Sequence, residues 1–191
     1  MKIIIAGAGA VGFHLAALLA EEDQDITLID TDEEVLNHAA THLDVMTIRG
    51  DAASTDVLEQ ANIERTKLFL AVTTSEKTNL LDAILAKQMG AKKNIARVSN
   101  PEYLEETQKA IFQKLGVDIL ISPQILAAQE IQRLLQRGSF TDVFEFEKGK
   151  ISVVGFKAGP SCPLINKTIG EIDALNPDFD FKSIAILRGH E

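Results

Sequence analysis

Cysteine is nearly absent from this chain, since Cys162 is the only one among its 191 residues. A single thiol excludes an internal disulfide and a cysteine-based zinc cluster, and this usage is typical of a reducing cytoplasm. Long apolar runs are also missing, because no segment approaches the roughly 18 apolar residues that a membrane-spanning helix needs. The sequence predicts a cytoplasmic protein that does not itself span a membrane.

Positive charge is scarce as well. The chain has 19 Lys and Arg against 28 Asp and Glu, which gives a formal net charge of −9. This balance argues against a general nucleic-acid or anionic-membrane surface. At 46% hydrophobic and 25% charged residues, the composition is that of an ordinary globular protein, long enough for one full domain and a smaller one.

Several catalytic signatures are missing. Tyr103 is the only tyrosine and Thr107 stands four positions later, so no Tyr-x-x-x-Lys pair exists. Neither a P-loop pattern nor a G-x-S-x-G elbow occurs. His38 and His42 are one helical turn apart, but without a third ligand a polar helix face is the better interpretation than a metal site. We therefore expect no enzyme activity.

A glycine-rich loop is the most informative feature that is present. Gly7-Ala8-Gly9-Ala10-Val11-Gly12 follows an apolar run and obeys G-x-G-x-x-G, the dinucleotide fingerprint of a βαβ unit. In this pattern Gly7 allows a tight turn, Gly9 lets the backbone approach a pyrophosphate, and Gly12 lets a helix pack closely. A helix beginning at Ala10 would direct free N–H groups at the phosphates.

Asp30 completes the fingerprint, because it ends the predicted strand 25–30 about 20 residues beyond the loop. Its carboxylate can accept both ribose hydroxyls of an adenosine. The next four residues contain three acids and no Lys or Arg for a 2′-phosphate, which favours NAD or NADH, or an adenine nucleotide such as ATP or ADP, over NADP. Asp30 could instead cap a helix starting near Asp32, but its register with the glycines favours the ligand.

Short apolar runs alternate regularly with helical patterns as far as residue 122. Such strands suit a parallel sheet covered on both faces. We predict an α/β fold, a Rossmann-type doubly wound sheet in the order 3-2-1-4-5-6, as a nucleotide-binding domain over 1–122. The expected strands are 2–6, 25–30, 45–49, 67–72, 94–98 and 118–121, and the expected helices are 10–22, 32–42, 54–61, 75–89 and 102–114.

The remainder is expected to form a linker and a small α+β domain. The segment 123–139 holds one more amphipathic helix, whose apolar side covers either its own sheet or a partner chain. Within 140–191 we predict a hairpin of 140–147 with 151–156 around a turn at 148–150, a short helix at 168–173 and a strand at 182–187. This core is thin, which suggests a truncated domain or one completed by another chain.

Further candidates stand where the predicted strands end, because ligands bind at the carboxyl ends of parallel strands. Asp51 could bond a ribose, although capping a helix near Ser54 is favoured. Thr73 and Thr74 could meet a ribose or phosphates, and Thr73 also has capping-box spacing to Glu76. Arg97 is equally well interpreted as a clamp on a phosphate or partner, or as a solvated arginine.

Five blocks of the sequence together resemble the RCK, or KTN, regulatory domains of potassium transport. The blocks are Lys2 to Gly12, Leu28 to Asp32, Gly50 to Ala52, Ala71 to Asn79, and Ala96-Arg97. The block after the fourth strand is far more specific than the glycines. The resemblance covers residues 1 to about 137, and the part from Phe140 resembles the start of the companion C-terminal RCK domain, which is normally longer. We therefore expect an N-terminal fragment of a longer protein.

The resemblance implies a regulatory subunit that is not an enzyme. It implies that residues 7–11, Asp30, Thr73, Thr74 and Arg97 bind NAD or NADH. It further implies a homodimer through the sheet edge and the helix at 124–137, with rings of such dimers, possible tetramers among them, beneath a membrane potassium transporter on the inner face of the membrane. Nucleotide exchange would then gate the transporter. An ATP/ADP-sensing subunit of a Ktr-type transporter and an NAD-dependent oxidoreductase domain remain as alternatives.

Overall fold

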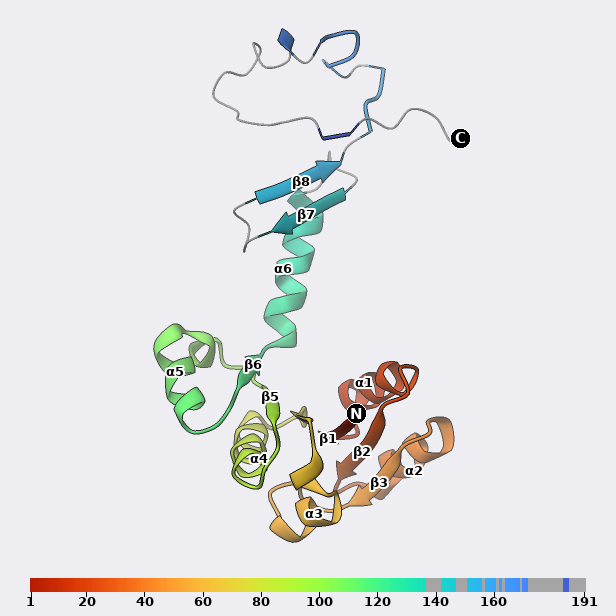
Figure 1. Ribbon diagram of the computed structural model, residues 1–191, viewed down its shortest axis with the longest axis vertical. Helices are drawn as coiled ribbons and strands as arrows, with labels where there is room; N and C mark the ends of the chain where they lie inside the picture. Colours follow the sequence, from red (N-terminus) through yellow and green to blue (C-terminus); the bar gives the residue numbers. More distant parts are fainter. Residues whose placement is uncertain are drawn as a thin grey trace. The chain divides into compact units, whose positions relative to one another are not determined.

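The computed structural model describes residues 1–136, 142–146, 151–155, 157–160, 162, 164–168, 170–171 and 184–185. The chain divides into two compact units, Met1–Ile131 and Gln132–Glu191. The division falls inside the last helix of the first unit, α6, and Figure 1 shows the elements of both units in chain order.

A six-stranded parallel sheet organises the first unit. Its order is β3-β2-β1-β4-β5-β6, as predicted (Figure 1). The chain crosses from the β3 edge to β4 beside β1, so the order reverses between β1 and β4, which is the position where ligands bind in doubly wound sheets. The strands are β1 (Lys2–Ala6), β2 (Asp25–Asp30), β3 (Met46–Arg49), β4 (Leu68–Ala71), β5 (Lys93–Arg97) and β6 (Ile119–Ile121).

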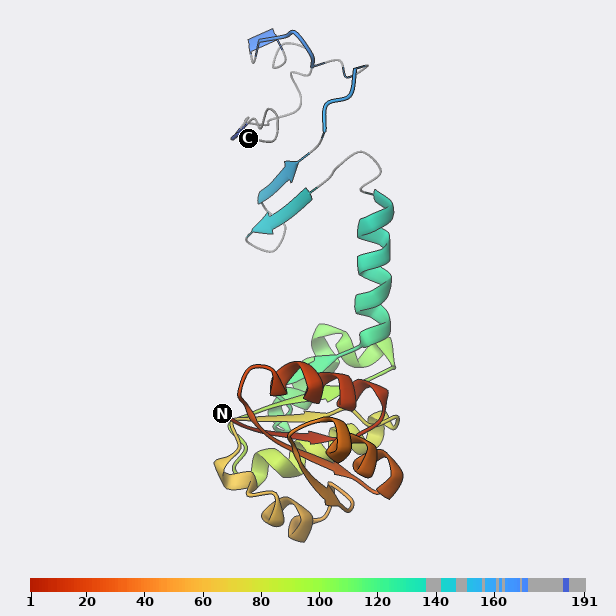
Figure 2. The same ribbon diagram turned by 90° about the vertical axis from the view of Figure 1, so that its right-hand side faces the viewer.

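Helices cover the sheet on both faces. In Figure 2, α1 in red lies above the sheet and α3 in tan lies below it. Among the described residues, no helix is both long and apolar enough to cross a bilayer. The helices are α1 (Ala10–Ala20), α2 (Glu33–His42), α3 (Thr55–Gln60), α4 (Glu76–Gln88), α5 (Glu106–Lys114) and α6 (Pro123–Gln136), with single 3-10 turns η1 (Ile63–Arg65) and η2 (Pro101–Leu104).

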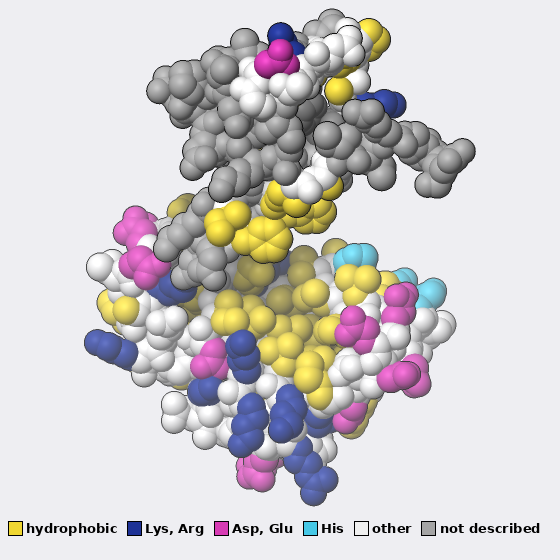
Figure 3. Space-filling view, turned by 45° about the horizontal axis from the view of Figure 1, so that its top comes forward, with side chains coloured by type: hydrophobic (Ala, Val, Ile, Leu, Met, Phe, Trp, Pro, Cys, Tyr) yellow, Lys and Arg dark blue, Asp and Glu magenta, His cyan; other side chains and the backbone are white. Residues whose placement is uncertain are grey.

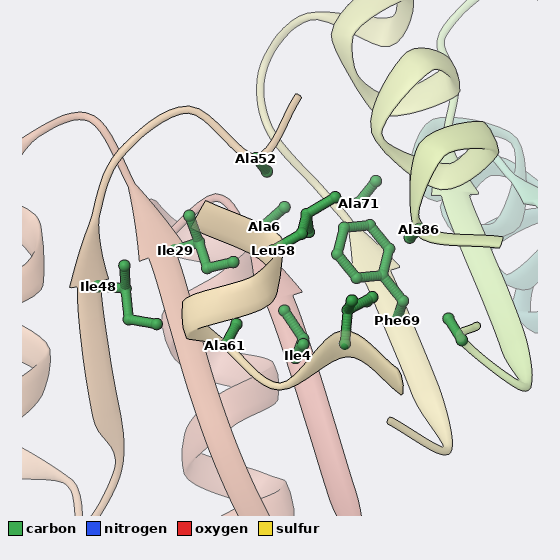
Figure 4. Packing of buried hydrophobic residues seen from close by; sticks show 12 residues of the cluster. Ile4, Ala6, Ile29, Ile48, Ala52, Leu58, Ala61, Phe69, Ala71 and Ala86 are labelled. Carbon is green, nitrogen blue, oxygen red and sulfur yellow. The ribbon is translucent and has the colours of Figure 1, made fainter. Parts of the chain in front are cut away.

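The two-sided core explains why the strands are apolar at every position. Alternate residues of β1 point to opposite faces, so Ile3 and Ile5 pack under α1 and α2 while Ile4 packs on the α3 and α4 side. On that second side Phe69 and Leu58 are fully buried, and Figure 4 shows them facing each other across the sheet surface. Burying these five aliphatic or aromatic side chains contributes on the order of 8–15 kcal/mol to stability.

The predicted helix over 102–114 is wrong as a single element. The structure has the short turn η2, then an extended residue, Glu105 (φ −65°, ψ 143°), and then α5. Pro101 begins η2, and Asn100 caps it by accepting a hydrogen bond from the Glu102 N–H (3.1 Å). A capped start at Asn100 sets the direction of η2, and the extended Glu105 redirects the chain into α5.

The helix predicted after Pro123 is present, and its apolar side does not cover the sheet of its own unit. Leu126 and Ile131 are 50% and 57% exposed, and the other described side chains from Ala127 to Gln132 are exposed as well. Of the two interpretations, packing against its own sheet is therefore wrong for residues 126–131. The side chains of Leu134 and Leu135 lie outside the described ones.

The second unit contains the predicted hairpin. Strands β7 (Asp142–Phe146) and β8 (Ile151–Gly155) pair antiparallel, with Phe144 opposite Val153. The turn predicted at 148–150 lies outside the described residues. Most of the short helix predicted over 168–173 and of the strand predicted over 182–187 also lies outside the described residues. Of the residues described there, Gly170 and Glu171 are helical, and Ile184 and Ala185 lie in no strand.

Candidate nucleotide-binding site

The three glycines of the loop after β1 play three distinct structural roles. Gly7 has φ +101°, which favours glycine, and a Cβ there would lie 2.9 Å from the Thr73 nitrogen. At Gly12 a Cβ would lie 1.7 Å from the Gly7 carbonyl oxygen, so only glycine lets α1 pack against the loop. At Gly9 a Cβ would meet nothing within 4 Å. Neither packing nor backbone strain requires glycine at that position, and the space beside it is open.

The amino end of α1 is free to receive an anion. Gly9 is the N-cap and offers no side-chain hydrogen bond, and the first turn contains no acidic residue. The helix starts with the Phe13 N–H bonding the Gly9 carbonyl (2.8 Å). The N–H groups of Ala10, Val11 and Gly12 therefore have no acceptor within the helix, and together with the helix dipole they favour a phosphate.

Asp30 ties the glycine loop to the turn that follows β2. Its Oδ2 accepts a hydrogen bond from the Ala8 N–H (2.7 Å), and its Oδ1 accepts one from the Asp32 N–H (3.0 Å). The N-cap of α2 is Asp32, whose Oδ1 accepts from the Glu34 N–H (2.8 Å), so the interpretation of Asp30 as the cap is wrong. Each carboxylate oxygen keeps a further lone pair, which leaves room for a ribose hydroxyl.

A cation that sequence reasoning missed stands beside Asp30. Arg49 is its register partner on β3, and its Nη1 donates to Glu33 Oε2 (2.6 Å). Both side chains are about two-thirds exposed, so this ion pair contributes at most about 1 kcal/mol. Nevertheless, Glu33 neutralises the one arginine that the sheet brings next to the expected ribose position.

The loop after β4 is held by a buried amide, Asn79 of α4. The Thr73 N–H and hydroxyl both donate to Asn79 Oδ1 (2.8 and 2.7 Å), and Asn79 Nδ2 donates to the backbone carbonyls of Thr73 and Arg97 (3.1 and 2.9 Å). Asn79 is 1% exposed. The Thr73 hydroxyl proton is thus engaged inside the protein, whereas the hydroxyl of the exposed Thr74 makes no hydrogen bond within the described part of the chain.

The capping box predicted between Thr73 and Glu76 is wrong. Ser75 caps α4, with its Oγ accepting a hydrogen bond from the Thr78 N–H (3.3 Å). The Glu76 carboxylate instead accepts from the N–H groups of Ser99 and Asn100 (2.8 and 2.9 Å), and these bonds lower its pKa below the ordinary value. Glu76 therefore fastens the start of α4 to the loop after β5.

Asp51 and Arg97 occupy the two flanks of this edge. Asp51 Oδ1 accepts a hydrogen bond from the Ala53 N–H (2.9 Å), whereas the N-cap of α3 is Ser54 without a side-chain bond. The favoured prediction that Asp51 caps that helix is therefore wrong, and Asp51 stabilises the turn before it. Arg97 is half-buried, and its side chain has no hydrogen bond or ion pair within the described part of the chain.

The sheet brings every predicted site residue to one edge. In strand order the carboxyl ends carry Asp51, Asp30, the glycine loop, the loop of Thr73 and Thr74, and Arg97. Five strands at about 4.8 Å spacing place the outer two roughly 20 Å apart, which is the scale of an extended dinucleotide. The glycine loop lies at the switch point between β1 and β4, where a pyrophosphate binds in doubly wound folds.

The histidine pair on α2 belongs to a ring cluster. The rings of His38 and His42 stack with centroids 4.3 Å apart, and Phe13 of α1 packs 4.9 Å from His38. His42 Nδ1 lies 2.8 Å from the His38 carbonyl oxygen. No group of three potential metal ligands occurs among the described residues.

Residues 3–123 match the family model of the TrkA-N domain. The match spans most of the chain and coincides with the six-stranded sheet. The chain belongs to the TrkA-N domain family. The resemblance to regulatory domains of potassium transport drawn from the five sequence blocks is thereby confirmed.

Curated relatives place the TrkA-N domain in proteins of potassium uptake. The chain is 39% identical over 174 residues to the Trk system potassium uptake protein TrkA homolog of Archaeoglobus fulgidus, covering 90% of the chain but only 39% of that relative. It is 36% identical over 191 residues to TrkA of Halomonas elongata, of which it covers 41%. A shorter homolog from Methanothermobacter thermautotrophicus is 34% identical and is covered to 77%. The chain thus spans about two-fifths of the first two relatives.

Solved structures share the TrkA-N fold. The TrkA-N domain of the Escherichia coli inner membrane protein ybaL superposes with a TM-score of 0.62 at 18% identity, covering 70% of this chain and 96% of that one. The RCK domain of GsuK superposes with a TM-score of 0.58 at 25% identity, covering 71% and 28%. Both cover about the length of the six-stranded unit.

Sequence reasoning missed three residues that shape the TrkA-N site. Asn79 lies inside the block that carries the resemblance, yet its bonds to two separate strand ends follow only from the fold. Glu76 has the spacing of a capping partner for Thr73, and instead its carboxylate holds the loop after β5. Arg49 becomes relevant through the register of β2 with β3, and nothing in the local sequence indicates that pairing.

Proposed function

We propose that this chain is the nucleotide-sensing part of a regulatory subunit of a membrane potassium uptake system, and that its ligand is NAD or NADH. The observation that carries the proposal is the loop around Gly9. It offers free helix-start amides next to open space, and the Asp30 carboxylate is fixed against the Ala8 N–H beside it. This arrangement fits a pyrophosphate and an adenosine ribose joined as in a dinucleotide.

The carboxyl edge of the sheet is better suited to binding a nucleotide than to catalysing hydride transfer. An oxidoreductase needs a proton donor or acceptor at the nicotinamide ring and a substrate pocket. Among the candidates at the described carboxyl edge, the carboxylates of Asp30 and Asp51 accept hydrogen bonds from backbone N–H groups, and the guanidinium of Arg97 offers donors only. The alternative of an oxidoreductase domain would require its catalytic groups from elsewhere.

The choice among nucleotides follows from charge around the ribose position. Asp30, Asp32 and Glu33 surround it with carboxylates, and Glu33 occupies Arg49, so a 2′-phosphate on NADP is disfavoured. Adenine nucleotides without a nicotinamide share the same ribose and remain the competing ligands. Solved chains of the same fold are described as bound to NAD, to ADP and to AMP.

The exposed apolar side of α6 supports an oligomer. Leu126 and Ile131 of this helix each have half or more of their surface in solvent, and exposed apolar surface of this kind gains stability by packing against a second copy. We propose a homodimer through α6, with rings of dimers beneath the transporter on the cytoplasmic face of the membrane. Nucleotide exchange gates the transporter in this proposal by binding two arrangements of the paired domains unequally.

Calorimetric titration of the purified chain with NADH, NAD⁺, NADP⁺, ATP, ADP and AMP tests the ligand. We expect selective binding of NADH or NAD⁺ without turnover. Gly9→Val is the matched negative variant, because the space around Gly9 is open and its φ of −64° suits valine, so folding is preserved while pyrophosphate space is filled. If ATP or ADP binds in preference to NADH and NAD⁺, the proposed ligand is wrong and the nucleotide-sensing role stands. If no nucleotide binds, the whole proposal is overturned.

A further inference from the structure

Cations gather at the amino edge of the sheet, opposite the nucleotide edge. Arg65 and Lys67 stand immediately before β4, and Lys92 and Lys93 stand at the start of β5. All four are exposed. Figure 3 shows Lys and Arg side chains in dark blue collected on one part of the first unit. These four residues are called the amino-edge cluster.

Backbone contacts fix the cluster in place. The Lys92 N–H bonds the carbonyl of Thr66, the residue between Arg65 and Lys67 (3.1 Å). The Lys67 N–H in turn bonds the Lys2 carbonyl (3.0 Å), which joins the start of β4 to that of β1. Neighbouring strands lie about 4.8 Å apart, so the four Cα atoms fall within roughly 10–15 Å.

The cluster carries charge that the protein does not neutralise. The cations on either side of it are paired, Lys2 with Asp25 (3.7 Å) and Lys87 with Asp118 (2.8 Å). Within the described part of the chain, no member of the cluster has an ion pair. The acid nearest in sequence is Glu64, and it makes no ion pair with any member. Four cations beside the single acid Glu64 thus leave a local excess of positive charge in a chain of net charge −9.

The cluster lacks the features of a site for a small phosphate. The carboxyl ends of α1 and α4 point to this edge, so it presents helix carbonyls rather than the free amides that cradle phosphates. Exposed lysines without such a cradle bind negative charge that is spread over a surface. Because charges act over roughly 8 Å at physiological salt, acids farther away than Glu64 do not cancel the positive excess of the cluster at contact.

We propose that the amino-edge cluster docks on anionic lipid headgroups and turns the nucleotide edge away from the membrane. The inference deepens the peripheral location proposed above and rests on it for the choice of a membrane as the anionic surface. The negative remainder of the chain is repelled by the same membrane, so the cluster sets the orientation. Each cation near such a surface raises the partition coefficient roughly fivefold, and an oligomer presents several clusters at once.

Co-sedimentation with vesicles tests the inference. Phosphatidylcholine vesicles with about 30% phosphatidylglycerol should sediment the chain, whereas pure phosphatidylcholine vesicles should not. Raising salt from about 0.05 M to about 0.5 M should release it. Lys92→Glu with Lys93→Glu should lower the partition coefficient at least about 25-fold. The matched control Lys77→Glu with Lys109→Glu changes net charge equally on α4 and α5, away from the cluster, and should retain most of the binding.

Equal sedimentation with both vesicle types, or equal loss in both double variants, would overturn the inference. So would failure of the wild type to sediment with anionic vesicles at low salt. Calorimetric titration with NADH on the same preparations separates the two proposals. If the chain binds NADH but not anionic vesicles, only the lipid-docking inference is refuted. If it binds the vesicles but no nucleotide, only the proposed nucleotide function is refuted.

Discussion

Asp82 of α4 should limit the stability of this chain at neutral and higher pH. Its side chain is fully buried, and neither carboxylate oxygen has a hydrogen-bond partner among the residues that the structure describes. Burial, and to a smaller extent the negative charge of Asp51, raises the pKa of Asp82 from 3.8 to about 7. A buried ionised carboxylate without a partner is costly, so the folded chain holds the proton.

The pH dependence follows from the proton count. Between about pH 4 and pH 7 the folded chain keeps a proton on Asp82 that the unfolded chain has lost. In that window the free energy of unfolding falls by about 1.4 kcal/mol per pH unit as pH rises, and above pH 7 the loss stays constant at about 4 kcal/mol. Asp82→Asn removes the charge at similar volume and should be more stable than wild type by up to about 4 kcal/mol at pH 8.

Urea denaturation at pH 4.5 and pH 8 measures the effect. We expect the two proteins to differ by no more than about 1 kcal/mol at the lower pH, because the wild-type carboxyl is then mostly protonated and the variant amide is also unpartnered. Asp44 is an exposed acid without a hydrogen bond or ion pair within the described part of the chain, so Asp44→Asn is the matched control and should follow the wild type at both pH values. Parallel stability curves for wild type and Asp82→Asn across this range would refute the reasoning.

Three further outcomes are expected. Asp30→Ala should weaken NADH binding by on the order of 1–3 kcal/mol in calorimetry, because ribose hydroxyls lose their acceptor, and unchanged affinity would place the adenosine elsewhere. Glu33→Gln should free Arg49 and narrow the preference for NADH over NADP⁺ by about threefold to tenfold, and a ratio equal to wild type would show that Arg49 lies out of reach. Leu126→Glu with Ile131→Glu should give monomers in sedimentation velocity if α6 pairs two copies, and an unchanged profile would exclude that interface.

The parts of the fold that the sequence predicts well are those encoded within a few neighbouring residues. The apolar run before Gly7 and the spacing of the glycines correctly predict β1, the turn and the start of α1, because sterics at Gly7 and Gly12 are local requirements. The strand order follows from the alternation of elements and the handedness of the crossovers. The break at Glu105 was missed because helical periodicity continues across it, although Pro101 already limits where a helix can begin.

The parts that were missed depend on residues far apart in the sequence. Arg49 stands beside Asp30 only through strand register, and the amino-edge cluster assembles from loops that precede two different strands. The net charge of −9 argued against a membrane-facing surface, because a sum over the whole chain hides a local cluster of cations. In the sequence Asp82 looks like any other acid on a helix, because its burial without a partner follows only from the fold. The amide of Asn79 can make four hydrogen bonds, and only the folded chain brings their partners to it.

The bonds of Asn79 have a mechanical consequence. One amide joins the loop after β4, where a nucleotide would touch Thr74, to the last carbonyl of β5, and Glu76 adds a second link to the residues beyond it. A ligand that shifts this loop must carry the end of β5 with it or leave buried polar groups unpaired, at about 1–3 kcal/mol each. Displacement at the nucleotide would then pass to β6, which pairs with β5 and leads directly into α6. The helix α6, whose residues Leu126 and Ile131 are exposed, would therefore be the next element to move.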